Sequence, residues 1–249
     1  MSQKKTFIYP EKLFEVLINN SNLNTDSKIL EIGTSNSLAS LPLLSLGLDV
    51  KSVEINSKKS VQKDNERIQF KNLSFDETEF TTDFYDLIYI TKPNEINKSH
   101  PAFNKSYNLL NSAGKLAIIE MIPIVNSEAK NFSPIEKELF KEYFNYTLLS
   151  EEDDFKISHS EYQKDIFTIN NFHIFYTLES YTLDEYVNFI KSFPEFEILT
   201  KEVQEGILTK IEKAVVEDSS IEKKITKKHA FVLTVLSKKQ KQLSLTFNS

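Results

Sequence analysis

Short apolar runs alternate with helix-like segments over the first half of the chain. The apolar runs predict strands at residues 29–32, 50–54, 68–70, 85–90 and 115–121. The segments between them predict helices at residues 38–44, 56–66 and 101–110. Because strands that alternate with helices form right-handed crossovers, this order predicts a parallel sheet with helices on both faces.

The pattern changes after Met121, where helices begin to dominate. Apolar residues at helical spacing predict helices at residues 134–146, 182–190 and 203–211, and aromatic or β-branched runs predict strands at 167–176 and 229–236. Thr182 and Glu185 have the spacing of a capping box at the start of the second of these helices.

Together these elements predict one Rossmann-like α/β domain over residues 1–249. Its sheet is mostly parallel and seven-stranded, with an antiparallel last strand and a helical cap inserted after the fifth strand. The predicted core covers residues 1–122, 165–177 and 227–238, and the predicted cap covers mainly residues 123–164 and 178–220.

Composition narrows the classes of function. The chain has no cysteine, which excludes disulfides, thiol nucleophiles and cysteine-ligated zinc, and its four histidines make no metal-spaced pair. A net charge of −6 disfavours binding to nucleic acids, and no apolar run is long enough to span a membrane. We therefore expect a cytoplasmic protein with no metal and with neither a nucleic-acid nor a membrane partner. The oligomeric state stays open.

Candidate chemistry lies where the first two strands end. Gly33 ends the first strand and precedes Thr34–Ser37, a segment rich in helix-capping residues whose backbone N–H groups could face a ligand. Glu54 ends the second strand, 21 residues further on, where a carboxylate can accept hydrogen bonds from ribose hydroxyls. The alternative is a surface glutamate on a generic α/β protein.

Four short motifs lie along the predicted strands: Lys28–Gly33, Ser52–Asn56, Asp83–Ile88 and Leu109–Leu116. In sequence and order they resemble motifs of class I S-adenosylmethionine-dependent methyltransferases. Three further segments are similar to small-molecule members of the trans-aconitate methyltransferase type: Tyr9–Pro10, Tyr181–Tyr186 and His229–Leu233. The resemblance covers nearly the whole chain, with the motifs in the family's order, and implies S-adenosylmethionine as the cofactor.

The resemblance also implies roles for individual residues. Glu31 and Gly33 would line the methionine part, Glu54 would hold the ribose, and Ile55 would pack on the adenine. The remaining implied cofactor residues are Tyr9, Thr34, Ser35, Ser37, Ser74, Phe75 and Thr91. If the acceptor is a carboxylate, Lys92 would hold it, and if it is a hydroxyl, Glu95 would be the base. The alternative for both is exposed loop charge.

The expected reaction is methyl transfer to an oxygen atom of a small molecule. Ser35 and Ser37 stand where family members usually have glycine, so the alternative is an inactive methyltransferase-fold protein that serves as a binding or scaffold subunit. A nicotinamide-dependent oxidoreductase needs G-x-G-x-x-G, and Gly33 stands alone. A nucleic-acid methyltransferase is disfavoured because Thr91–Asn94 lacks an aromatic residue that would grip a flipped base.

Overall fold

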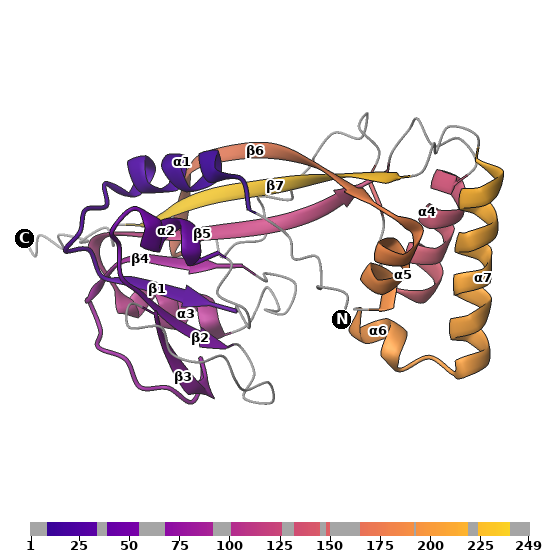
Figure 1. Cartoon of the computed structure of the whole chain (residues 1–249). Coiled ribbons are helices and arrows are strands. Elements are labelled where there is room, and N and C mark those ends of the chain that lie inside the picture. The colour runs from indigo at the N-terminus through magenta and orange to yellow at the C-terminus, as the bar shows by residue number, and fades with distance from the viewer. Residues whose placement is uncertain are drawn as a thin grey trace, which may run out of the picture. The chain divides into compact units, whose positions relative to one another are not determined.

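The computed structural model describes residues 9–33, 39–54, 68–91, 101–125, 132–144, 148–149, 165–191, 193–218 and 224–239. Over these ranges the chain forms an α/β fold, a β-sheet with helices packed on it, as the sequence predicts (Figure 1). The strands are β1 (Ile29–Ile32), β2 (Val50–Glu54), β3 (Ile68–Ser74), β4 (Tyr85–Ile90), β5 (Leu110–Ile124), β6 (Phe167–Tyr181) and β7 (Ile225–Lys238). The helices are α1 (Glu11–Ser21), α2 (Leu41–Ser45), α3 (Pro101–Leu109), α4 (Phe132–Tyr143), α5 (Leu183–Lys191), α6 (Pro194–Glu197) and α7 (Lys201–Glu217).

The described strands form one seven-stranded sheet in the order β3-β2-β1-β4-β5-β7-β6. The pairs β1–β2, β1–β4, β2–β3 and β4–β5 are parallel. Strand β1 therefore lies between β2 and β4, and the strand order reverses beside it. In an open parallel sheet such a reversal is where ligands bind, at the carboxyl ends of the strands.

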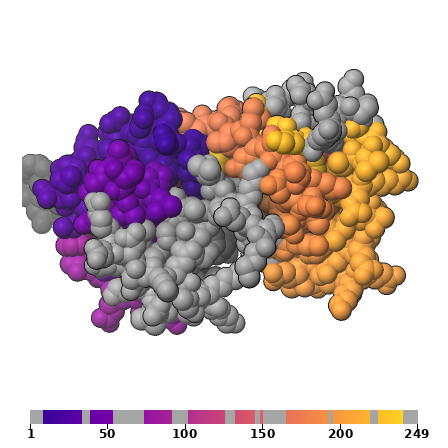
Figure 2. All heavy atoms as spheres, viewed as in Figure 1, coloured from indigo at the N-terminus to yellow at the C-terminus, as the bar shows by residue number. Residues whose placement is uncertain are grey.

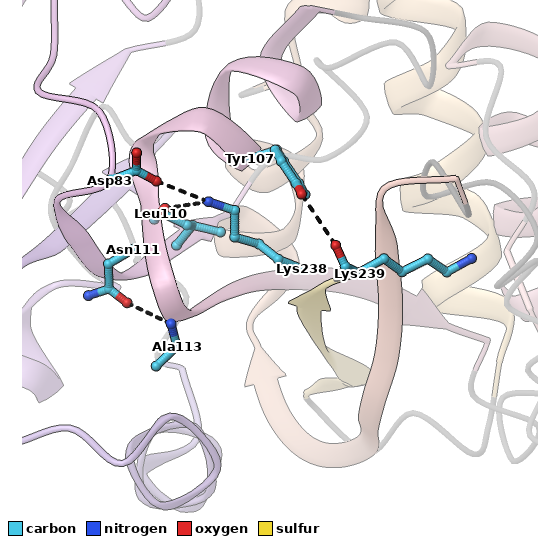
Figure 3. Close-up of polar contacts among 7 residues, drawn as sticks. All are labelled: Asp83, Tyr107, Leu110, Asn111, Ala113, Lys238 and Lys239. Carbon is cyan, nitrogen blue, oxygen red and sulfur yellow. Dashed lines mark hydrogen bonds and ion pairs between the residues drawn. The ribbon is translucent and has the colours of Figure 1, made fainter. Parts of the chain in front are cut away.

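Side-chain contacts show that β7 runs opposite to β5. The ammonium of Lys238, at the end of β7, donates to the carbonyl oxygen of Leu110, at the start of β5, over 2.7 Å (Figure 3). The ammonium of Lys227, near the start of β7, lies 3.5 Å from the carbonyl oxygen of Ile124, at the end of β5. Only opposite strand directions place both pairs together.

The chain divides into two compact units. The sheet unit comprises residues 9–120, 156–174 and 232–249, and the helical unit comprises residues 1–8, 121–155 and 175–231. Each unit has its own apolar core. Strands β5, β6 and β7 contribute residues to both units.

In the sheet unit, helices cover both faces of the parallel strands. Leu30 and Ile32 of β1 belong to a buried cluster that includes Ala102 and Phe103 of α3. Glu31 lies between Leu30 and Ile32 and therefore points to the opposite face, where its carboxylate binds a side chain at the start of α2. Helices α1 and α2 contact each other, and their atoms adjoin on the face seen in Figure 2.

In the helical unit, aromatic residues fill the core. Tyr186 is fully buried, and Phe189 and Phe193 pack against the same cluster. The predicted capping box is confirmed as well, because Glu185 accepts from the backbone N–H of Thr182 at 2.8 Å and the Thr182 hydroxyl accepts in return at 3.2 Å. Among the described helices, none combines the length and the apolar character needed to cross a membrane.

Residues 111–114, which precede the strand predicted at 115–121, lie inside β5. Tyr85 pairs with Leu110 and Leu87 pairs with Lys115, so the register shifts here and β5 makes an extra excursion. The Asn111 side chain accepts from the backbone N–H of Ala113 at 3.0 Å and stabilises this excursion (Figure 3). Asn, Ser and Gly, residue types that favour turns, thus lie within a strand at its register shift.

Gly114 is expected to tolerate no side chain. A Cβ there would lie 2.6 Å from the carbonyl oxygen of Tyr85 and 3.0 Å from a methyl carbon of Leu110. We expect Gly114→Ala to lower the free energy of unfolding by about 1–3 kcal/mol, because the backbone must shift to relieve the overlap.

Gly206, inside α7, is the matched control. A Cβ there would meet nothing within 4 Å. Gly206→Ala should raise the free energy of unfolding by about 0.5–1 kcal/mol, since alanine favours the helix. Urea denaturation of both variants measures the difference, and a stabilised Gly114→Ala protein would contradict this account.

Candidate functional site

The carboxyl ends of three parallel strands are tied together by backbone hydrogen bonds. The N–H of Gly33, just after β1, donates to the carbonyl oxygen of Val53 in β2 at 2.9 Å. The N–H of Thr91, just after β4, donates to the carbonyl oxygen of Ile32 at 3.2 Å. Gly33 has a φ of +98°, which favours glycine and turns the chain away from the strand. The structure therefore brings Gly33 and Thr91 to one edge of the sheet.

Strand β3 extends this edge. Glu54 pairs with Ser74, after a register shift between Val53 and Glu54. The edge thus carries, in order, Thr91, Gly33, Glu54 and Ser74, and we call this row the rim. The side chain of Glu54 lies outside the described part of the structure, as do the following predicted site residues: Thr34, Ser35, Ser37, Ile55, Lys92 and Glu95.

Glu31 lies beneath the rim, on the face of the sheet that carries α2. It is fully buried, and its Oε2 accepts hydrogen bonds from the hydroxyls of Ser40 and of Ser52, the latter at 2.8 Å. The Tyr89 hydroxyl lies 3.1 Å from that of Ser40. Ser52 and Tyr89 are the residues that pair with Glu31 in the neighbouring strands. These four residues, which we call the Glu31 cluster, form a buried polar group in an apolar sheet.

Sequence reasoning missed the three partners of Glu31. One signal was present: Glu31, Ser52 and Tyr89 each lie two residues before a rim residue, so side-chain alternation places all three on one face. Polar residues that pair with one another in three neighbouring, mostly buried strands are expected to form hydrogen bonds with one another. Ser40 is close to them only because α2 folds back over the sheet.

The negative charge of Glu31 affects the pKa of two tyrosines, Tyr9 and Tyr89. Burial, and then the negative charge of Glu31, raise the pKa of Tyr9 above its ordinary value of 10.0. The same two causes raise the pKa of Tyr89. The Tyr9 ring makes an edge contact with the Phe14 ring of α1, with centroids 5.9 Å apart. Both hydroxyls therefore stay protonated at neutral pH and can donate hydrogen bonds.

The turn after β3 is held by Ser74 and Glu77. The hydroxyl and the backbone N–H of Ser74 donate to Oε2 of Glu77 at 2.7 and 3.1 Å. The backbone N–H of Glu77 donates to the Ser74 hydroxyl at 3.3 Å. Phe75, one of the implied cofactor residues, is 1% exposed and packs into the core of the sheet unit. At this turn, Glu77 is thus the exposed side chain that Ser74 orients.

Comparisons with known proteins identify the fold. No family model matches the sequence, and no curated protein matches it. A protein from Anaeromyxobacter dehalogenans, named provisionally as a type II methyltransferase, matches with a TM-score of 0.68 at 12% identity, over 93% of this chain and 97% of that one. A protein from Bacillus halodurans, also named provisionally as a methyltransferase, matches with a TM-score of 0.51 at 10% identity, over 93% of this chain and 100% of that one. The chain therefore shares its Rossmann-like fold with proteins named as methyltransferases.

Proposed function

We propose that this protein is an S-adenosylmethionine-dependent methyltransferase that acts on an oxygen atom of a small molecule. The observation that carries the proposal is the rim, where Gly33, Glu54 and Thr91 meet beside the reversal of strand order. This is where an open parallel sheet binds nucleotides and related ligands. The shared fold and the family motifs support the same cofactor.

The rim residues fit the parts of this cofactor. The positive φ of Gly33 lets the backbone approach a ligand closely, and Glu54 ends β2 where a ribose acceptor belongs. When bound, S-adenosylmethionine supplies an electrophilic methyl group. The protein would then hold the acceptor oxygen in line with the methyl group, which needs positioning more than acid–base groups. The roles of Lys92 and Glu95 at the acceptor stay predictions.

We assign Glu31 a supporting role at this site. Its carboxylate is buried and bound to Ser40, the residue that precedes α2, and to Ser52 of β2. It therefore links β1 both to β2 and to the start of α2. Strand β1 and helix α2 are the elements before and after the segment that follows Gly33. Holding these ends together keeps the rim in shape for binding.

Glu54→Ala tests the ribose role. Loss of a carboxylate that accepts from ribose hydroxyls should weaken binding of S-adenosylhomocysteine about 10- to 100-fold, because hydrogen bonds to charged groups contribute about 1.5–3 kcal/mol. Isothermal titration calorimetry measures this change, and methyl transfer should fall in parallel.

Lys58→Ala, four residues further along, is the matched control and should leave the affinity unchanged. Equal affinities in the two variants would refute the ribose role of Glu54. If the wild-type protein gives neither heat nor a thermal shift with S-adenosylmethionine, the methyltransferase proposal fails and the scaffold alternative is favoured.

A further inference from the structure

The two outer strands of the sheet differ in how well their sequences discourage pairing with another chain. An outer strand has backbone N–H and C=O groups free on one side, and proteins protect it by short length, irregular register, lysine or proline. Strand β3, at one end of the strand order, is seven residues long, contains Lys71 and shifts register beside β2. Strand β6, at the other end, is 15 residues long and contains no lysine, arginine, proline or glycine. Its sequence therefore favours pairing with a further strand.

Strand β6 also carries exposed apolar side chains in the part of it that belongs to the helical unit. Tyr176 and Leu178 are 51% and 71% exposed, and within the described strands they are the exposed large apolar residues. They lie two positions apart, so they share one face of the strand. Apolar groups gathered on an outer strand indicate a surface that another chain covers.

We propose that two copies of this chain form a reversible dimer by antiparallel pairing of their β6 strands, with the two-fold axis at Thr177. A dimer of this symmetry uses the same surface of both copies. With the axis at Thr177, Tyr176 of each copy lies opposite Leu178 of the other. The exposed apolar residues then cover each other twice, and such cross-strand pairs stabilise a sheet.

Charge and size are both consistent with a second copy as the occupant. Between Phe175 and Tyr181 the strand has one charged residue, Glu179, whose carboxylate accepts from the Tyr181 hydroxyl at 2.5 Å. In the proposed register Glu179 lies opposite Phe175, so the two carboxylates do not oppose each other. A strand pair this short buries less than the roughly 1,200 Å² of a stable dimer. The dimer is therefore weak, and its population rises with protein concentration.

Sedimentation velocity over a series of protein concentrations tests the dimer. Wild-type protein should pass from monomer to dimer in the micromolar range. Leu178→Lys should weaken association about tenfold or more, because the new ammonium would face Tyr176 of the other copy. The Lys228 ammonium already lies 4.7 Å from the centroid of that ring, so like charges would meet. Ile198→Lys is the matched control, since Ile198 is 84% exposed in the same unit but outside β6, and it should leave association unchanged.

Cysteine cross-linking tests the register, because the chain has no cysteine of its own. Directly opposed residues of antiparallel strands lie within the distance that a disulfide spans. An oxidised mixture of Tyr176→Cys and Leu178→Cys proteins should therefore give several-fold more cross-linked dimer than a mixture of Ile198→Cys and Leu178→Cys proteins.

Three results would overturn the proposal. The first is wild-type protein that stays monomeric at every concentration. The second is a wild-type dimer that Leu178→Lys leaves as stable as before, because that dimer would use another surface. The third is equal cross-linking in the two cysteine mixtures, because Tyr176 and Leu178 would then not face each other.

Discussion

Lys227→Met is expected to lower the free energy of unfolding by about 3–5 kcal/mol, because it leaves a buried carboxylate without its cation. The Lys227 ammonium lies 2.6 Å from Oε2 of Glu136, and the two side chains are 1% and 3% exposed. The Tyr186 hydroxyl donates to the other carboxylate oxygen of Glu136. The contacts join β7, α4 and α5 inside the helical unit. Urea denaturation, with the m-value checked for two-state behaviour, measures the loss.

Two further variants separate the ion pair from side-chain packing. Glu136→Met combined with Lys227→Met should recover much of the stability, because an apolar pair replaces both charges. Lys213→Met is the surface control, since the Lys213–Glu217 pair is long at 3.9 Å and both side chains are exposed; it should change stability by less than about 0.5 kcal/mol. A Lys227→Met loss below about 1 kcal/mol would contradict this account.

Glu31→Leu is expected to lower the free energy of unfolding by about 2–4 kcal/mol. The substitution leaves the hydroxyls of Ser40 and Ser52 without their shared acceptor in a fully buried place, and each stranded hydroxyl costs about 1–3 kcal/mol. Thermal and urea unfolding of the purified variant measure the loss.

The triple variant Glu31→Leu, Ser40→Ala and Ser52→Ala tests whether the lost stability comes from the two hydroxyls left without an acceptor. Removing the donors together with the acceptor should restore part of the lost stability, because apolar replacement of both partners is far less costly than removal of one. Glu15→Leu on α1 is the exposed control and should change stability by less than about 0.5 kcal/mol. If the triple variant is less stable than Glu31→Leu, the Glu31 cluster does not act as described.

Local patterns were enough to place most elements of the sheet unit. Strands β1, β2 and β4 are short and end at Ile32, Glu54 and Ile90, and each begins and ends where the sequence predicts. The other four strands, β3, β5, β6 and β7, are longer than predicted. Strand β7 begins at Ile225, four residues before the predicted start. The prediction began too late because a lysine at position 227 is typical of a solvent-exposed residue. Its burial depends on Glu136, 91 residues away, which no local pattern reveals.

The candidate site was predictable only where its residues lie at the ends of predicted strands. Gly33 follows β1 and Glu54 ends β2, as predicted, so parallel topology alone brings them to one rim. Ser74 joins them because β3 runs four residues past its predicted end. The partners of Glu31 depend on strand register and on the return of Ser40 over the sheet. The orientation of Glu77 depends on a turn that Lys105 braces from a helix 28 residues further along the chain. Contacts between distant segments were thus the part that local patterns could not supply.

Three strands carry the chain from one compact unit to the other, between residues 120 and 121 in β5, 174 and 175 in β6, and 231 and 232 in β7. Each of these three crossings falls within a strand. An expression clone that ends at any of these points would cut a strand of the sheet and expose its unpaired backbone edge, a template for aggregation. Truncation at these crossings is therefore a poor route to isolated fragments, and biochemical work is best planned on the intact polypeptide.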